Sequence, residues 1–233
     1  GWTAAPFQRE VWKRYMAGES GLLQTPTGSG KTLAAFGGPL LEAFAQKPKQ
    51  APAARPRKRP APRPHGSLKV LWITPLRALA VDTARALRAP IEALGLDWVV
   101  AMRTGDASAR DRRLARSGQA DVLVTTPESL SLLLSYPDTA PQLSHLQCVI
   151  VDEWHELLGN KRGVLLQLAL ARLRRLNPAL RIWGVSATLG NLEEARDALL
   201  PHLPDAPLVA GVAPKRFTLD TLLPGEDERF PWG

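Results

Sequence analysis

The chain has 233 residues, 45% of them hydrophobic, which is enough to bury the core of one large α/β domain or two small ones. No stretch approaches the apolar length of a transmembrane helix, the first residues lack a basic and then apolar signal segment, and a single cysteine, Cys148, excludes an internal disulfide. The sequence therefore excludes a membrane-spanning protein and a disulfide-stabilised secreted domain, and we expect a cytoplasmic protein.

The net charge of +8 is concentrated in one segment. Eight of the 30 Lys and Arg residues lie between 46 and 69, where there is no acid, and the other 22 balance 22 Asp and Glu residues. This segment is rich in proline and has no aliphatic residue larger than alanine before Leu68, so we predict a disordered insert over 46–69. It is either a solvated linker or an arm that contacts nucleic-acid phosphates, and the sequence leaves both interpretations open.

Outside the insert, segments with strand and helix patterns alternate along the chain. Helices are predicted from Thr3 to Gly18, up to Ala45, and over 77–94, 106–116, 127–134, 162–176 and from Asn191; strands are predicted over 21–24, 69–75, 97–102, 121–125, 148–152, 181–185 and 207–210. This alternation predicts an α/β fold with a mostly parallel sheet and helices on both faces. Beyond residue 216 the pattern thins, so 217–233 is predicted to begin a linker.

A glycine-rich loop follows the first predicted strand and precedes a helix. In such a P-loop, backbone N–H groups converge on a phosphate at a helix N-terminus. The predicted nucleotide ligands are Thr27, Gly28, Ser29, Gly30, Lys31 and Thr32. Lys31 would supply the cation, and the Thr32 hydroxyl would bind Mg²⁺. The general pattern has glycine where this chain has Thr25, and the competing interpretation is a Gly/Ser turn that happens to precede a lysine.

Two adjacent carboxylates, Asp152 and Glu153, stand at the end of an apolar strand, the edge where α/β sheets bind ligands. Asp152 is predicted to hold Mg²⁺, and Glu153 to orient and deprotonate the water that attacks the γ-phosphorus of ATP. His155 is placed to bridge the nucleotide and a neighbouring strand end, although a lone histidine is usually structural. Lys31 and Thr32 are expected to face the carboxylates across adjacent strand ends.

Taken in order, these motifs resemble those of the DExH-box helicases of superfamily 2, in their first RecA-like domain, over nearly the whole chain. The matching segments are Phe7-Gln8 (Q motif), 25–32 (motif I), 74–79 (motif Ia), 104–106 (the Thr-Gly motif), 125–129 (motif Ib), 152–155 (motif II) and 186–188 (motif III). The resemblance implies a RecA-like P-loop NTPase domain over 1–216, in which Gln8 reads the adenine edge.

Within this superfamily, residues 72–80, 152–157 and 186–191 look most like the Lhr (large helicase-related) group, especially its bacterial ligase-associated Lhr-Core type. That resemblance implies an ATP- and Mg²⁺-dependent translocase that moves 3′ to 5′ along single-stranded DNA, displaces a paired DNA or RNA strand, acts in DNA repair, and joins the nucleoid when on DNA. A second RecA-like domain and C-terminal domains are the implied partners. Without the arginine of that second domain, we expect this chain alone to hydrolyse ATP poorly.

The resemblance also places polar residues at strand ends, where they can meet a sugar-phosphate backbone without reading bases. The predicted nucleic-acid ligands are Thr74, Pro75, Arg77, Thr104, Gly105, Thr125 and Thr126. Helix capping is the competing role, above all for Thr125 and Thr126 before Pro127. Ser186 and Thr188 are predicted to couple the two sites through a hydrogen bond to His155.

Two other classes of function remain open from the sequence. A P-loop phosphotransferase would need a substrate pocket or lid, and the long insert has no pattern of ordered structure. A non-catalytic nucleic-acid adaptor would use the basic insert as its binding arm, with strongly salt-dependent affinity.

Overall fold

The computed structural model describes residues 3–47, 68–105, 107–143, 145–187 and 189–211. Its α-helices are α1 (Pro6–Met16), α2 (Lys31–Ala45), α3 (Arg77–Ala93), α4 (Ala109–Ser117), α5 (Pro127–Ser135), α6 (Thr139–Leu143), α7 (Lys161–Leu176) and α8 (Leu192–Leu199), with a 3₁₀ turn, η1, at Trp154–Glu156. The strands are β1 (Gly21–Gln24), β2 (Val70–Ile73), β3 (Val100–Arg103), β4 (Val122–Thr125), β5 (Cys148–Val151), β6 (Arg181–Ser186) and β7 (Leu208–Ala210). Thr188, Asp106 and the predicted linker 217–233 lie outside the described residues.

The seven strands form one sheet in the order β3-β4-β2-β5-β6-β1-β7, and each neighbouring pair is parallel. The predicted α/β class with a parallel sheet is therefore confirmed. One expectation is wrong: β6 lies between β1 and β5, so the phosphate loop and the acidic pair do not follow adjacent strands. Because all strands point the same way, both still lie at the carboxyl edge of the sheet.

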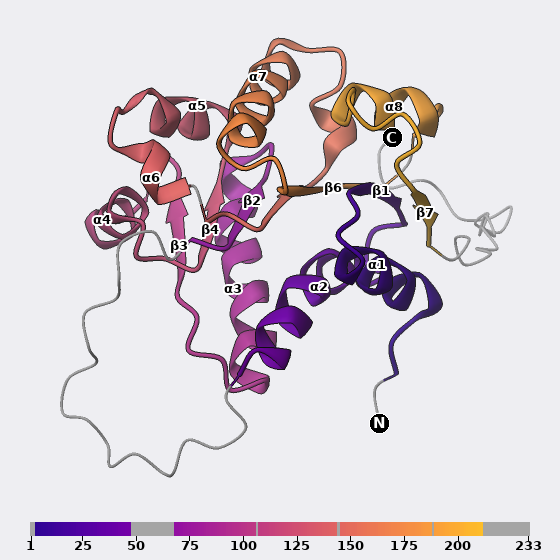
Figure 1. Ribbon diagram of the computed structural model, residues 1–233, viewed down its shortest axis with the longest axis horizontal. Helices are drawn as coiled ribbons and strands as arrows, with labels where there is room; N and C mark the ends of the chain where they lie inside the picture. The colour runs from indigo at the N-terminus through magenta and orange to yellow at the C-terminus, as the bar shows by residue number, and fades with distance from the viewer. Residues whose placement is uncertain (1–2, 48–67, 106, 144, 188, 212–233) are drawn as a thin grey trace, which may run out of the picture.

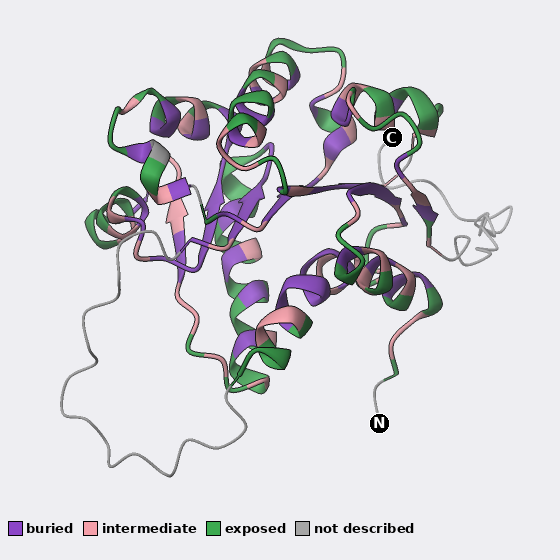
Figure 2. Ribbon diagram, viewed as in Figure 1, coloured by how far each residue is buried: buried purple, intermediate pink, exposed green. Residues whose placement is uncertain are grey.

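Helices cover both faces of the sheet. Figure 1 shows α1, α2 and α3 along the lower side and α5, α7 and α8 along the upper side. Each face has its own buried cluster: α1 to α3 contribute to one, and α4 to α8 to the other. The strands between them are largely buried, whereas the outer faces of the helices are exposed (Figure 2).

The central strands are apolar because both of their faces are covered. All four residues of β2, β4 and β5 are buried, as the continuous apolar runs in the sequence predict for a parallel sheet. The covering helices show the complementary pattern, in which one face is apolar. In α3 the buried residues Ala80, Ala84, Leu87 and Ile91 recur at helical spacing, and the charged residues of the helix lie on its exposed side.

The structure changes several predicted boundaries. The cap residue of α1 is Ala5 rather than Thr3, and α4 begins at Ala109 after the Ser108 cap. The turn η1 and the short helix α6 were not predicted, because neither is long enough to show a periodic pattern.

Both ends of the predicted insert lie on the folded body. Lys47 Nζ donates to Gly95 O at 2.9 Å, Leu68 is 3% exposed, and Lys69 pairs with Asp121 at 2.7 Å. The insert is therefore shorter than 46–69, and its residues 48–67 lie outside the described part. No described helix is long and apolar enough to cross a bilayer.

Candidate nucleotide-binding site

The phosphate loop connects β1 to α2 through two glycines with left-handed backbone. Gly28 has φ of 77° and Gly30, the N-cap of α2, has φ of 92°. This conformation strongly favours glycine, and a Cβ at Gly30 would also lie 2.7 Å from Gln8 Nε2. The loop thus turns beneath the N-terminus of α2, where unpaired N–H groups and the helix dipole attract a phosphate.

Thr25, which replaces the glycine of the general pattern, stabilises the loop from its buried side. Its side chain is 1% exposed, and its hydroxyl donates to Ser29 Oγ at 2.7 Å. Its backbone N–H donates to Ser186 O at 3.0 Å, which joins the loop to the end of β6. Thr27 and Gly28 are exposed and Ser29 and Thr32 are partly exposed, so the opposite side of the loop is open to a ligand.

The acidic pair lies directly opposite Lys31. Lys31 Nζ forms an ion pair with Glu153 Oε1 and lies 3.8 Å from Asp152 Oδ1, and all three side chains are at most 20% exposed. Burial raises the pKa of Asp152, and the charge of Lys31 acts in the opposite direction. These two carboxylates and the lysine are therefore assembled as the sequence predicts, with β6 between the strands that carry them.

Glu153 is held in an unusual conformation. It is the only non-glycine residue in the described part of the chain with positive φ, at 47°, and its N–H donates to Asp152 Oδ1 at 3.0 Å. Its Oε2 atom is buried and accepts no hydrogen bond from any described residue. Such strain and such an unused acceptor are concentrated at functional sites, and the free oxygen suits a base that orients a water.

A magnesium ion would need ligands beyond the protein. Among the described residues no group of three or more His, Cys, Asp and Glu side chains could hold a metal by itself. The Asp152 carboxylate and the Thr32 hydroxyl are hard oxygen donors of the kind that Mg²⁺ prefers, and phosphate and water oxygens normally complete such a shell. The residues present therefore fit an ion that binds together with a nucleotide.

His155 connects the acidic pair to the end of β6. Its Nδ1 lies 3.0 Å from Ser186 Oγ and 3.6 Å from Glu153 Oε2, and Ser186 is fully buried. The predicted contact between His155 and Ser186 is therefore present. Ser186 also accepts the hydrogen bond from Thr25, so one residue contacts both the phosphate loop and the segment after Glu153.

Comparison with known proteins places the chain among nucleotide-dependent enzymes. The family model of the DEAD/DEAH box helicases matches residues 5–195. The chain belongs to the DEAD/DEAH box helicase family. It is 38% identical to the Lhr helicase/probable uracil glycosylase of Mycolicibacterium smegmatis, over 95% of this chain and 14% of that protein. It is 34% identical to the ATP-dependent helicase Lhr-Core of Methanocaldococcus jannaschii, over 97% of this chain and 26% of that protein.

A solved structure of an Lhr helicase is also similar to this chain. The helicase Lhr of Mycobacterium smegmatis, bound to single-stranded DNA and AMP-PNP, matches with a TM-score of 0.72 and 35% identity, over 92% of this chain and 27% of that one. The predicted resemblance to DExH helicases of the Lhr group is thus confirmed. The chain spans between 14% and 27% of the length of these three relatives.

Within this DEAD/DEAH box domain, Gln8 lies beside the phosphate loop. It is 4% exposed; its Nε2 donates to Gly30 O at 3.1 Å and its Oε1 accepts from Ala5 N at 2.8 Å. Its carboxamide therefore joins the start of α1 to the start of α2. Recognition of adenine by Gln8 stays a prediction.

Three of the four threonines predicted to contact nucleic acid, Thr74, Thr125 and Thr126, are buried. The Thr74 hydroxyl donates to Leu76 O at 3.4 Å, the Thr125 hydroxyl donates to Arg103 O at 2.8 Å, and Thr126 Oγ1 caps α5 by accepting from Ser129 N at 3.4 Å. These hydroxyls shape the strand-end loops, and Pro75 is buried with them.

Among the residues predicted to contact nucleic acid, the ones that reach the surface are Arg77, Thr104 and Gly105. Arg77 and Gly105 are exposed and Thr104 is partly exposed. A Cβ at Gly105 would lie 2.9 Å from Arg77 Nη1, so the structure brings the predicted motif Ia and the Thr-Gly motif together. These three residues form a surface at the carboxyl edge of the sheet, which we call the strand-end surface.

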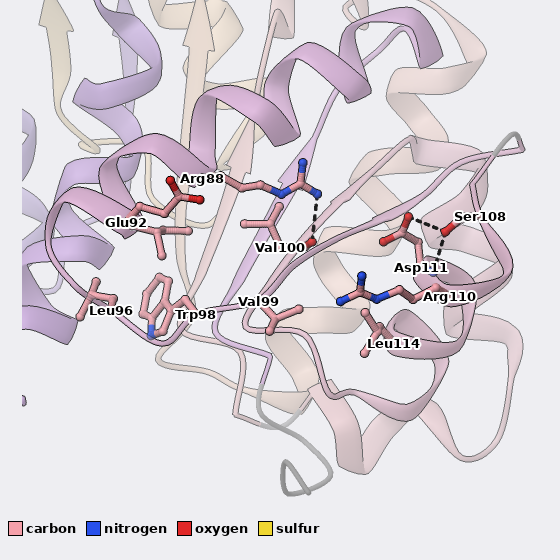
Figure 3. A pocket seen from close by; sticks show the side chains of 11 residues that line it. Arg88, Glu92, Leu96, Trp98, Val99, Val100, Ser108, Arg110, Asp111 and Leu114 are labelled. Carbon is pink, nitrogen blue, oxygen red and sulfur yellow. Dashed lines mark hydrogen bonds between the residues drawn. The ribbon is translucent and has the colours of Figure 1, made fainter. Parts of the chain in front are cut away.

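A separate cavity of about 440 Å³ lies at the free edge of β3. Figure 3 shows that its walls come from α3, from the segment before β3 and from α4. Arg88 donates to Val100 O at 3.4 Å and Ser108 donates to Asp111 at 2.7 Å across its lining. The residues of the phosphate loop and the acidic pair do not line it, so it is not part of the nucleotide site.

Proposed function

We propose that the chain is the nucleotide-binding half of an ATP-driven motor that moves along single-stranded DNA and displaces a paired DNA or RNA strand. The observation that carries this proposal is the cluster of Lys31, Asp152 and Glu153 in front of the N-terminus of α2. The ammonium group and the helix N-terminus suit a triphosphate, and the two carboxylates suit its hydrolysis.

Each residue then has a distinct role. The backbone N–H groups from Gly28 to Thr32 bind phosphate oxygens, and Lys31 neutralises their charge. Asp152 and Thr32 hold Mg²⁺, which when bound neutralises charge on the phosphates. Glu153 orients the attacking water and accepts its proton. We also propose that a second RecA-like domain of the whole protein completes the site, in line with the small share of its relatives that this chain spans.

For the nucleic-acid partner, the support is the strand-end surface and the similarity to a relative bound to single-stranded DNA. Arg77 offers a cation there, and Thr104 and Gly105 offer backbone and hydroxyl groups that can meet phosphates without reading bases. We further propose 3′-to-5′ movement and a role in DNA repair. Tailed duplexes with either a 3′ or a 5′ single strand test the direction.

The central test is ATP hydrolysis by the intact parent protein, with single-stranded DNA and RNA of the same sequence compared. Glu153→Gln should bind the nucleotide but slow hydrolysis by about 10²-fold or more, because it removes the base. Lys31→Ala should weaken both binding and hydrolysis. Normal turnover by Glu153→Gln, or turnover that no nucleic acid stimulates, would contradict the proposal.

Ser186 gives a second test, because it contacts His155 through its side-chain hydroxyl and the phosphate loop through its backbone carbonyl. Ser186→Ala combined with Thr188→Ala should leave ATP hydrolysis largely intact and reduce strand displacement. The backbone hydrogen bond from Thr25 to Ser186 O is retained in this variant, so the phosphate loop keeps its support. Equal loss of both activities would show that these residues have no separate coupling role.

A further inference from the structure

Arg162, the second residue of α7, joins three segments that are distant in sequence. Its Nε and Nη2 atoms both donate to the Glu128 carboxylate, Nη2 at 3.2 Å, and Nη2 also donates to Pro75 O at 2.5 Å. Glu128 lies in the first turn of α5, two residues after the Thr126 cap, and Pro75 lies between β2 and α3, two residues before Arg77. One guanidinium thus ties together the two strand-end loops that follow β2 and β4.

The same arginine is connected to the acidic pair by a short series of hydrogen bonds. Glu156 N donates to Glu153 O at 2.9 Å, and Asn160 Nδ2 donates to Glu156 O at 2.7 Å. Asn160 Oδ1, the cap of α7, in turn accepts from Arg162 N at 2.9 Å. The backbone that carries the catalytic base and the start of α7 therefore hold each other in place.

Packing makes this connection stiff. Gly163 lies so close to the preceding turn that a Cβ there would overlap Leu157 O, which leaves no space for α7 to shift toward η1. Helix α7 also packs along α5, the helix that carries Glu128. A displacement of η1 would therefore be transmitted to the Arg162 side chain rather than absorbed in a loose loop.

The ion pair between Arg162 and Glu128 is partly exposed to water, so we expect it to orient the loops more than it stabilises the fold. The side chains of Arg162 and Glu128 are 36% and 47% exposed. Ion pairs at such exposure contribute about 0 to 1 kcal/mol, because water screens the charges. The geometry of the contact is nevertheless specific: the planar guanidinium presents N–H donors in a fixed arrangement to both carboxylate oxygens and to a carbonyl, whereas a lysine is a compact charge on a flexible chain.

We propose that Arg162 is a positioning residue that sets the strand-end surface for nucleic acid according to the state of the segment after Glu153. The inference rests on the proposed function, and it assigns to Arg162 the link between the nucleotide site and the strand-end surface. Arg162 acts through Pro75 and Glu128: the Pro75 carbonyl fixes the loop that presents Arg77, and Glu128 fixes the start of α5.

The test uses the intact parent protein and four forms of it: wild type, Arg162→Ala, Arg162→Lys and Arg172→Ala. Arg172 is an exposed arginine on the same helix and is the matched control. Three quantities are measured: the affinity for a fluorescent ATP analogue, the affinity for single-stranded DNA with AMP-PNP, and the DNA concentration that gives half-maximal ATP hydrolysis.

Arg162→Ala should raise the half-maximal DNA concentration by about tenfold, within the usual range of coupling between two sites, and leave nucleotide affinity within about twofold. Arg162→Lys should give an intermediate shift, because one ammonium group can replace only part of the contacts. Arg172→Ala should behave as wild type. If Arg162→Ala lowers the melting temperature so far that binding cannot be measured, the half-maximal DNA concentration of Arg162→Lys alone tests the inference.

The inference is overturned if Arg162→Ala or, where needed, Arg162→Lys leaves the half-maximal DNA concentration at the wild-type value. It is also overturned if Arg162→Ala and Arg172→Ala have equal effects, or if nucleotide and DNA affinities fall in parallel, as general structural damage would produce. Failure of the proposed function looks different: the wild-type protein itself would show no hydrolysis stimulated by DNA.

Discussion

Replacing Glu42 by alanine should destabilise the domain through the elements that carry the site. Glu42 Oε2 on α2 accepts from Tyr15 Oη on α1 at 2.9 Å and from Arg181 Nη2 on β6 at 2.8 Å. Arg181 lies 3.9 Å from the centroid of the Tyr15 ring and is 13% exposed, while Glu42 is 21% exposed. Burial raises the pKa of Tyr15, so its hydroxyl stays protonated and donates.

The size of the loss in stability follows from the groups that Glu42→Ala leaves without a partner, the Arg181 guanidinium and the Tyr15 hydroxyl. Removing one partner of a fully buried ion pair costs about 3 to 5 kcal/mol, and we expect about 2.5 kcal/mol here because both side chains retain some contact with water. For a domain of this size, that corresponds to a fall in Tm of about 5 to 10 °C. Tyr15→Phe, which removes only a hydroxyl, should cost about 1 kcal/mol.

Urea denaturation of wild type, both single variants and the double variant checks these values. Because Tyr15 and Glu42 contact each other, the two losses should be less than additive in the double variant. A loss below about 1 kcal/mol for Glu42→Ala would refute the reasoning, since it would mean that water already screens the contact. Equal losses for the two single variants would likewise show that the Arg181 contact contributes nothing.

Three further predictions concern stability and reactivity. Gly163→Ala should cost more than about 2 kcal/mol in urea denaturation, because its Cβ would overlap the Leu157 carbonyl and the backbone there would have to move; a neutral result would contradict this packing. The hydrogen bond from Arg162 lowers the pKa of Glu128 from 4.5, so the Tm difference between wild type and Glu128→Gln should be full above pH 4.5 and shrink as the pH falls below it; a difference that is constant with pH would exclude the ion pair. Burial raises the pKa of Cys148 to about 12, so a thiol reagent at pH 8 should modify it only in unfolded chains, and rapid labelling of the folded chain would contradict its burial.

The sequence allowed the sheet to be predicted well because its strands are buried on both faces. Continuous apolar runs rich in β-branched residues, such as Cys148–Val151, indicate a covered strand, and in a parallel sheet the polar residues that follow such strands lie at one edge. The phosphate loop was equally predictable, since its glycines are required by backbone conformation. The order of the strands was not, because no local pattern records that β6 lies between β1 and β5.

The nucleic-acid ligands stay a prediction, because the sequence allows two roles for a threonine at a strand end. A threonine at a strand end can either cap a helix or contact a ligand, and the sequence around Thr126 is compatible with both. The structure shows the capping hydrogen bond from Ser129 N, and Thr126 is 1% exposed, so its hydroxyl serves as the helix cap in this structure. Arg162 was missed because its partners, Glu128 and Pro75, are 34 and 87 residues away and share no motif with it.

The position of β6 also explains how three separate motifs can act as one unit. Because β6 lies between β1 and β5, its last residue, Ser186, contacts both loops: its carbonyl accepts a hydrogen bond from Thr25 N in the phosphate loop, and its hydroxyl contacts His155, two residues after Glu153. We therefore expect a change in the distance between the phosphate loop and the acidic pair to move Ser186 as well, and the variant with both Ser186→Ala and Thr188→Ala tests this expectation.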